Sequence, residues 1–248
     1  MDVPYGVSLT NNLLLAALGD EVLHELEPHF RFQEVQVSER IYDKQVENDV
    51  VFPLDAVISL LRELDNGEAL EIGVIGAEGM AGVNALLGVP VNPHHGVVQG
   101  RGVVARIGRE ALARTVDEQA RARGVLHPYI YAYLSYLSQL AVCNRMHLVE
   151  QRLAHWLLLL HDRVAADEMS LTQEFLAYML GTRRAGINEA IGRLHDAGAI
   201  EHRRSRVTVL DRKKLEEMSC ECYAQNLTDY EAALGFLPQS KGRKAPID

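Results

Sequence analysis

Arginine side chains are gathered in one short part of this 248-residue chain, and their chemistry suits the binding of a polyanion. Between Thr182 and Lys214 there are nine Lys or Arg and four Asp or Glu, a net charge of +5 in a chain whose total is −9. A guanidinium group offers a rigid fork of N–H donors to phosphate oxygens or to a guanine edge. This local reversal of sign indicates a nucleic-acid-binding surface, although a merely solvated basic face would carry the same charge.

Two short helices and a hairpin are predicted to position these arginines. The first helix is expected over Thr172 to Leu180, where apolar residues recur at three- and four-residue spacings after a capping threonine. Gly181 then permits a tight turn into a second helix from about Thr182 to Ala197. Residues 200–210 predict two strands joined at 203–205. The second helix is expected to bury Ile187, Ala190, Ile191 and Leu194 and to expose Arg183, Arg184, Asn188 and Arg193.

The segment from Leu171 to Leu194 reads LTQEFLAYMLGTRRAGINEAIGRL and resembles the helix-turn-helix of the Crp/Fnr family of transcription factors. Weaker similarity extends over most of the chain. The resemblance implies an α+β fold with an N-terminal antiparallel β-roll (cyclic-nucleotide-binding-like), a long dimerisation helix and a C-terminal winged helix-turn-helix. The expected domains are a β-roll sensor or effector domain with flanking helices at 1–123, a dimerisation helix at 124–147, a DNA-binding domain at 148–225 and a C-terminal tail at 226–248.

Residue by residue, the resemblance implies that Thr172 contacts phosphate and that Arg184 reads guanine. Ala185 and Glu189 stand where the best-known members have a glutamate and an arginine, so we expect a different operator sequence. Two such units related by a two-fold axis would read an inverted repeat. The candidate DNA contacts are Thr172, Arg183, Arg184, Asn188 and, on the hairpin or wing, Arg203, Arg204 and Arg206.

Short apolar runs between residues 32 and 107 predict an antiparallel sandwich or barrel. The sequence Asp65-Asn66-Gly67 is a hairpin signal between two of these strands. An amphipathic helix is expected before them, ending near Pro28. The expected strands lie at 32–37, 50–52, 56–61, 69–75, 96–99 and 103–107.

In the Crp/Fnr β-roll, a glycine and a glutamate of one short loop grip a cyclic ribose phosphate. Residues 76–82, GAEGMAG, correspond best to that loop, so the resemblance implies effector contacts at Gly76, Glu78 and Gly79. The member that binds cyclic AMP adds an arginine-serine pair shortly afterwards, whereas the next arginine here is Arg101. We therefore expect a regulator without the standard cyclic-AMP site, and Arg101 is the fallback phosphate partner if the register of this segment differs from that of the family. A β-roll that still binds a cyclic nucleotide or another small ligand is the alternative.

A helix is expected over residues 109–123, followed by a longer one from about Pro128 to Met146. The longer helix carries an apolar stripe, which taken alone indicates simple core packing. In the family this helix pairs with its twin, so the resemblance implies a homodimer. A hinge is expected at 145–148, before a helix at 149–160 whose Trp156 helps to build the next core. The candidate dimer residues are Ile130, Leu134, Leu137 and Ala141.

The cysteines of the chain are Cys143, Cys220 and Cys222. They are too few for a disulfide framework, and an Fnr-type iron–sulfur cluster, which needs four thiolates, is not expected. Cys220 and Cys222 would point in different directions on a helix, so we interpret them as separate thiols and predict no metal site. His94 and His95 are interpreted as solvated loop residues. We predict no resident cofactor.

An enzymatic reading would pair Glu78 with His94 or His95 as acid and base, but the sequence offers no nucleophile or phosphate-binding loop for it. We therefore predict that the protein is not an enzyme. The sequence shows no signal-peptide pattern or long apolar run, which predicts a cytoplasmic protein. The expected partners are double-stranded DNA, a second copy of the chain and, from the resemblance, RNA polymerase.

Overall fold

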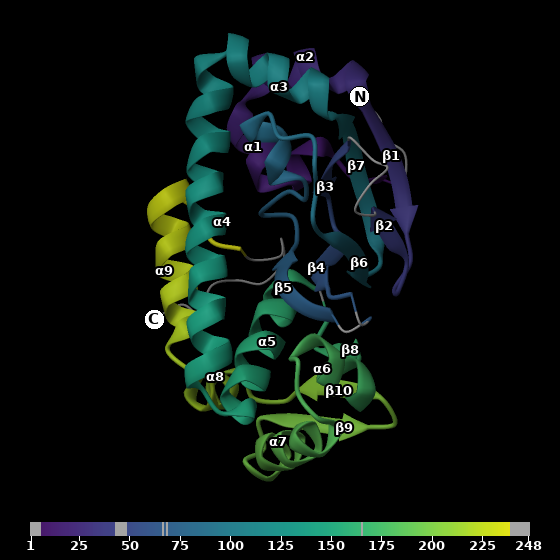
Figure 1. Ribbon diagram of the computed structural model, residues 1–248, viewed down its shortest axis with the longest axis vertical. Coiled ribbons are helices and arrows are strands. Elements are labelled where there is room, and N and C mark those ends of the chain that lie inside the picture. The colour runs from purple at the N-terminus through teal and green to yellow at the C-terminus, as the bar shows by residue number, and fades with distance from the viewer. Residues whose placement is uncertain (1–5, 43–48, 66, 68, 165, 239–248) are drawn as a thin grey trace.

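The computed structural model describes residues 6–42, 49–65, 67, 69–164 and 166–238. Two small sheets stand beside a long helix, and a compact group of helices and short strands lies at one end of both (Figure 1). Among the described residues, none of the helices combines the length and the apolar character that crossing a bilayer would require. The chain begins with η2 (Leu9–Asn11), α1 (Leu13–Leu18), α2 (Asp20–Leu26) and η3 (Glu27–His29).

Two antiparallel sheets form the N-terminal half and confirm the predicted β-roll architecture. One sheet has the strand order β1-β7-β3 and the other has the order β2-β6-β4-β5. Apolar residues of both sheets, such as Val35, Ile58 and Val104, pack into a common cluster. The strands are β1 (Phe30–Val35), β2 (Arg40–Tyr42), β3 (Asp49–Pro53), β4 (Val57–Glu63), β5 (Ala69–Ile75), β6 (His95–Gly100) and β7 (Gly102–Gly108).

Three local features of this half differ from or refine the prediction. The N-terminal helix is split, because Gly19 takes a φ of 79° between α1 and α2. Strand β2 is an extra strand that pairs with β6, and it is too short to give a periodic signal. Strands β4 and β5 form the predicted hairpin, although Asn66 of its turn lies outside the described residues.

The helix break predicted between residue 123 and Pro128 lies at Gln119 instead. Helix α3 (Arg109–Glu118) ends there, and α4 (Ala120–Met146) continues through both Gly124 and Pro128. A proline inside a helix cannot donate to the carbonyl four residues earlier and clashes with it. Here that earlier residue is Gly124, and Gln119 takes extended backbone angles that end α3. The 3₁₀ turn η4 (Val83–Leu87) packs against α3 and α4.

The C-terminal half begins after a break at His147, within the predicted hinge. Its last helix, α9, was not predicted, and it runs through the boundary expected between residues 225 and 226. Helix α9 lies along α4 (Figure 1), where Ser135 Oγ donates to Asp229 Oδ2 at 2.5 Å. The polar tail at 239–248 lies outside the described residues. The elements are α5 (Val149–Arg163), β8 (Glu168–Ser170), α6 (Gln173–Met179), α7 (Arg184–Asp196), β9 (Ile200–Arg203), β10 (Arg206–Val209), α8 (Arg212–Met218) and α9 (Cys222–Leu234).

The two halves share one hydrophobic core. Trp156 and its neighbouring leucines on α5 cluster with Leu61 and Val74 of the β-roll. Helix α6 packs against β5, and a Cβ built on Gly181 would lie 2.7 Å from Leu70 Cδ1. Gly181 therefore serves twice, because its φ of 55° closes the turn after α6 and its missing side chain admits Leu70.

Candidate nucleic-acid interface

The predicted pair of helices forms with the expected caps and buried face. Thr172 caps α6, and its Oγ1 accepts from the backbone N–H of Phe175 at 3.1 Å. Arg183 is the N-cap residue of α7 and has extended backbone angles. The second helix therefore starts at Arg184, two residues later than expected, and its inner face is Ile187, Ala190, Ile191 and Leu194 as predicted.

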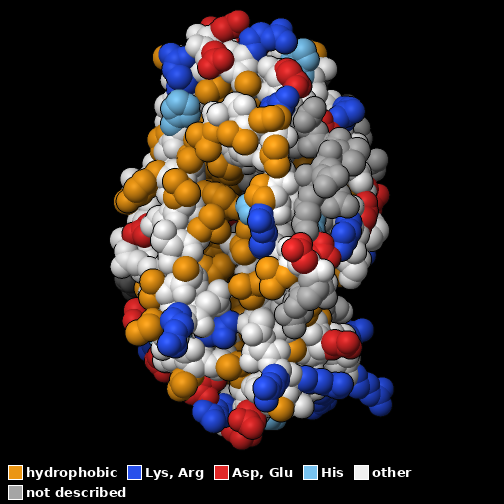
Figure 2. All heavy atoms as spheres, viewed as in Figure 1, with side chains coloured by type: hydrophobic (Ala, Val, Ile, Leu, Met, Phe, Trp, Pro, Cys, Tyr) orange, Lys and Arg blue, Asp and Glu red, His pale blue; other side chains and the backbone are white. Residues whose placement is uncertain are grey.

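The N-terminal end of α7 is basic and open to solvent. Arg183, Arg184 and Asn188 are exposed there, as are Ala185 and Glu189. Figure 2 shows Lys and Arg side chains gathered at the end of the molecule that holds α7 and the β9–β10 turn. The free N–H groups of a helix N-terminus add partial positive charge to that of the arginines. This end of α7 can therefore attract a phosphate and still present side chains to base edges.

The wing arginines differ in their partners. Arg203 is paired with Glu201 at 2.8 Å, and Arg206 is paired with Glu168 at 2.8 Å. Arg204 lies at the tip with a φ of 44°, and in the described part of the chain it has no ion pair. Arg204 thus offers its charge to an incoming anion without first leaving a carboxylate.

The start of α6 and the wing lie side by side. The backbone N–H of Leu171 donates to the carbonyl of Ser205 at 2.8 Å, which holds the wing turn next to Thr172. Together, α6, α7 and the wing place all seven candidate DNA contacts in one small domain, and each of them is exposed.

The effector residues predicted in the β-roll are engaged within the chain. Glu78 and Arg163 of α5 form a buried ion pair, with side chains only 4% and 5% exposed and an Nε–Oε1 distance of 2.8 Å. The same carboxylate accepts from the N–H of Gly76 at 3.1 Å. Arg101 does not join this group, because it is exposed in the turn between β6 and β7.

The space beside Glu78 is small. A cavity of about 20 Å³ lies between β5, α4, α5 and α9, which is room for about one water molecule. Helix α9 closes it on one side, where Tyr230 donates to the carbonyl of Glu78 at 3.1 Å. Gly79 lies against the ring of Tyr129. This cavity, as the described residues form it, is too small for a nucleotide.

A second buried carboxylate lies where α5 meets the β-roll. Glu71 of β5 accepts from Ser59 Oγ at 2.5 Å and from Trp156 Nε1 at 2.6 Å. Burial raises the pKa of Glu71 to about 8, although both hydrogen bonds and the charge of Arg163 act in the opposite direction. The contact between the two halves therefore contains a group that gains a negative charge in mildly alkaline solution.

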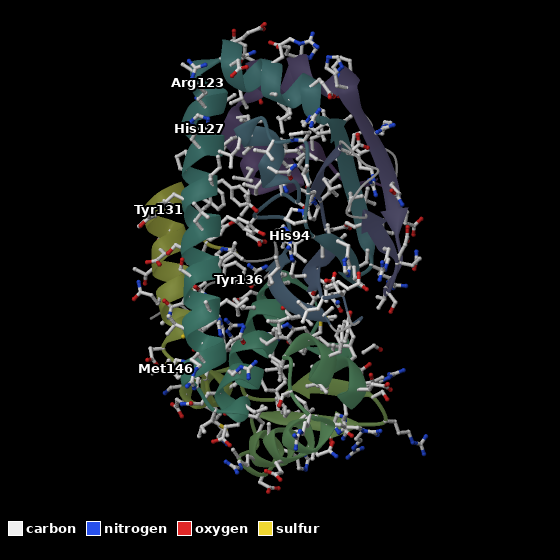
Figure 3. All side chains as sticks on the ribbon, in the orientation of Figure 1. His94, Arg123, His127, Tyr131, Tyr136 and Met146 are labelled. Atoms are coloured by element: carbon white, nitrogen blue, oxygen red, sulfur yellow. The ribbon has the colours of Figure 1, made fainter. Side chains whose placement is uncertain are left out.

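The prediction that His94 and His95 are solvated is wrong. His95 begins β6 and is only 1% exposed, with Nδ1 3.9 Å from Glu63 Oε2. His94 is half-buried and lies between α4 and the sheets (Figure 3). Burial, aided by the charge of Arg62, lowers the pKa of His94 to about 4. Strand β6 begins at His95, one residue earlier than the sequence pattern indicated, and His94 directly precedes it.

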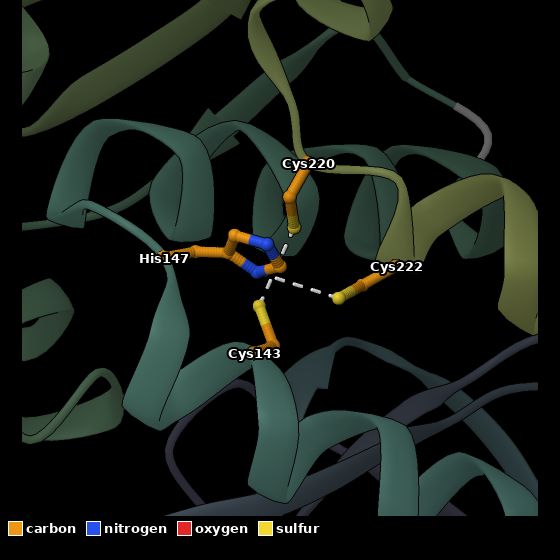
Figure 4. A group of neighbouring side chains, drawn as sticks. All are labelled: Cys143, His147, Cys220 and Cys222. Carbon is orange, nitrogen blue, oxygen red and sulfur yellow. Dashed lines mark hydrogen bonds between the residues drawn. The ribbon is translucent and has the colours of Figure 1, made fainter.

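The structure also brings together a group that the sequence reasoning separated. Ligand atoms of Cys143, His147, Cys220 and Cys222 all lie within 4.8 Å of one another (Figure 4). Cys220 precedes α9 and Cys222 begins it, so the two thiols do not diverge as they would inside one helix. The missed signal is the four-residue spacing of Cys143 and His147, because His147 directly follows the last residue of α4 and lies about one helical turn beyond Cys143.

The candidate dimer residues lie on two different faces of α4. Leu137 packs against the β-roll and Ile130 is partly buried, whereas Leu134 is 56% exposed and Ala141 is exposed. The exposed face also carries apolar residues that were not predicted. In Figure 3 the labelled His127, Tyr131 and Met146 follow the outer side of α4, while Tyr136 points toward β5. The large exposed apolar residues of α4 are Tyr131, Leu134, Val142 and Met146.

Comparison with known proteins agrees with this geometry. Residues 151–218 match the model of the Crp-like helix-turn-helix domain. A protein from Eubacterium rectale assigned to the Crp/Fnr family is similar in structure, with a TM-score of 0.68, 16% identity and coverage of 84% of this chain and 98% of that one.

Two further solved structures are similar. FixK2 from Bradyrhizobium japonicum has a TM-score of 0.65 and 16% identity, and the match covers 77% of this chain and 98% of that one. The c-di-GMP-responsive global regulator CLP from Xanthomonas campestris has a TM-score of 0.63 and 14% identity, and that match covers 76% of this chain and 98% of CLP. No curated protein sequence matches the chain.

Proposed function

Since this chain has the fold of the Crp/Fnr transcription regulators and carries a Crp-like helix-turn-helix domain, we propose that it regulates transcription by binding an inverted-repeat operator as a homodimer. The observation that carries the proposal is the exposed basic end of α7, with Arg183 and Arg184 beside the wing. Such a protein acts on DNA and, through it, on RNA polymerase in the bacterial cytoplasm. The similar proteins are regulators, and we propose no catalytic activity.

The exposed apolar face of α4 supports the homodimer. Tyr131, Leu134 and Val142 recur at helical spacing and stay open to solvent in the single chain. Helix α9 covers a neighbouring face of α4, so it leaves this stripe for another partner. A second copy would bury the stripe against its own equivalent, as a two-fold interface requires. Two recognition helices would then enter successive major grooves about 34 Å apart.

DNA binding without a cyclic nucleotide is part of the proposal. Arg163 already neutralises Glu78, the residue that the resemblance assigned to a cyclic ribose phosphate. The adjoining cavity of about 20 Å³ has no room for such a ligand. The β-roll then serves mainly to hold the DNA-binding domain and the dimer helix in place.

Selection of binding sites from random double-stranded DNA tests this function. The purified chain, without added nucleotide, should enrich an inverted repeat. Enrichment that requires cyclic AMP or cyclic GMP would instead establish an effector-dependent β-roll. Recovery of no sequence under any of these conditions would contradict the assignment of α7 as a recognition helix.

A substitution in α7 then tests the proposed reading residue. Arg184→Ala should cost about 1–3 kcal/mol of discrimination at one position of each half-site and leave the dimer intact. Arg114→Ala, an exposed change on α3, is the matched control. Unchanged specificity in Arg184→Ala would remove this residue from the base contacts.

A further inference from the structure

Three thiols and one imidazole converge where α4 ends and α9 begins. Cys143, Cys220 and Cys222 are each no more than 3% exposed, and the His147 side chain is 13% exposed. The Cys143 and Cys220 sulfurs are 3.4 Å apart, and Cys222 Sγ is 3.5 Å from His147 Nδ1. Figure 4 shows the four side chains pointing toward one centre: Cys143 from α4, His147 from the residue after it, Cys220 from the segment before α9 and Cys222 from the start of α9.

These separations fit a tetrahedral zinc site. With Zn–S bonds of about 2.3 Å and a Zn–N bond of about 2.0–2.1 Å, the tetrahedral edges are about 3.8 Å between sulfurs and about 3.6 Å between sulfur and nitrogen. The two short separations in the cluster are close to these edges, and every other pair lies within 4.8 Å. Small rotations of the side chains would therefore complete the polyhedron.

The ring of His147 is oriented as a metal ligand. Its Nδ1 faces the thiols, while Nε2 lies 3.3 Å from Glu221 Oε2. Zinc-bound imidazoles usually donate their second N–H to a carboxylate in this way, which fixes the ring and strengthens the ligand nitrogen.

The surroundings supply donors for thiolate sulfurs. Gln139 Nε2 donates to Cys222 Sγ at 3.0 Å. His155 Nε2 can accept from Asn226 Nδ2 at 3.2 Å, which leaves the ring proton on Nδ1, 3.4 Å from Cys143 Sγ. Such donors stabilise the negative form of sulfur that binds metal.

The charge of the site is also compensated. Zn²⁺ with three thiolates and one neutral imidazole carries a net charge of −1. A cationic side chain lies next to this site: the Arg152 guanidinium donates to Oδ1 of Asn144, the chain neighbour of Cys143, at 2.9 Å. Arg152 also donates to the carbonyl of Leu180, in the turn between α6 and α7.

We propose that Cys143, His147, Cys220 and Cys222 form a structural Cys₃His zinc site that fastens α9 to the end of α4. Three sulfur ligands and one imidazole select zinc over magnesium or calcium, which prefer oxygen. The site stands at the junction of the dimer helix and the DNA-binding domain. Zinc therefore holds α9 in the position where it closes the cavity beside Glu78.

Metal analysis of the full chain, purified with a reductant and reconstituted with zinc, is the first test. The protein should retain about one zinc per chain after removal of excess metal. His147→Ala and Cys222→Ser should each lose it. His127→Ala, an exposed histidine nearer the start of the same helix, should retain it.

Cobalt binding to the wild-type protein tests the site even if the ligand variants fail to fold. Co²⁺ added to the chelated wild-type protein should produce the intense visible bands of a tetrahedral site and sulfur-to-cobalt charge transfer. Gln139→Ala keeps all four ligands, so it should keep this spectrum and weaken zinc affinity about 10- to 100-fold.

Two results would overturn the proposal. One is a reduced wild-type protein that takes up no zinc and shows an octahedral cobalt spectrum. The other is full zinc retention by both His147→Ala and Cys222→Ser. A wild-type protein that binds no metal and keeps a Cys143–Cys220 disulfide under reductant would overturn the proposal in the same way as the first result. The cluster would then be a redox pair.

Discussion

Replacing Glu71 by glutamine should remove a large part of the pH dependence of stability. The folded-state pKa of this carboxyl is raised by burial from 4.5 to about 8, so the folded protein holds a proton that the unfolded chain releases between these values. A raised acid pKa gives stability that is fully present below the unfolded pKa and is lost as pH rises through the folded pKa. The loss is about 1.4 kcal/mol per pH unit inside this window.

From about pH 6 to about pH 9, the wild-type free energy of unfolding should therefore fall by about 2–3 kcal/mol through this group. Glu71→Gln imitates the protonated form, since its oxygen can accept from Trp156 Nε1 and its amide can donate to Ser59 Oγ. Urea unfolding at both pH values, followed by far-ultraviolet circular dichroism, measures the difference. Contributions from other titrating groups cancel between wild type and variant.

Glu118→Gln, an exposed change at the end of α3, is the matched control and should behave as wild type does. If Glu71→Gln loses as much stability between the two pH values as wild type, Glu71 is ionised in the folded protein at neutral pH. The reasoning about its burial would then be refuted.

Two further predictions concern the DNA-binding surface and the dimer. Arg204→Ala should reduce the slope of log affinity against log salt by about one unit, measured by fluorescence anisotropy on operator DNA. Arg203→Ala should change it less, because Arg203 must first leave Glu201. Leu134→Glu should shift sedimentation from dimer toward monomer without loss of helix content, since it puts two like charges in the proposed interface. A dimer that survives this change would place the two-fold axis away from the exposed face of α4.

The two halves of the molecule contact each other through strand β5. Leu70 and Glu71 of β5 meet Gly181 and Trp156, so the helix-turn-helix rests directly on the β-roll. A change of charge or packing at β5 therefore acts on the domain that carries the recognition helix. The same contact gives the β-roll a direct route by which to act on the proposed recognition helix.

The sequence by itself determined the local elements of the DNA-binding domain. The cap at Thr172, the glycine turn at Gly181 and the apolar face of α7 depend on neighbours within a few residues. Short-range periodicity and turn chemistry carry that information. The basic character of this domain could also be predicted from the sequence, because an arginine side chain is positively charged wherever its helix lies in the fold. Most strands of the β-roll were found for the same reason.

Tertiary structure alone decided which distant residues meet. Glu78 pairs with Arg163, and Glu71 accepts a hydrogen bond from Trp156; each pair is separated by 85 positions of sequence. Cys143 and Cys220 are separated by 77 positions. No periodic pattern links residues so far apart, since their approach depends on how α4, α5 and α9 pack. The return of α9 along α4 therefore brings three scattered thiols into one cluster and closes one side of the small cavity beside Glu78.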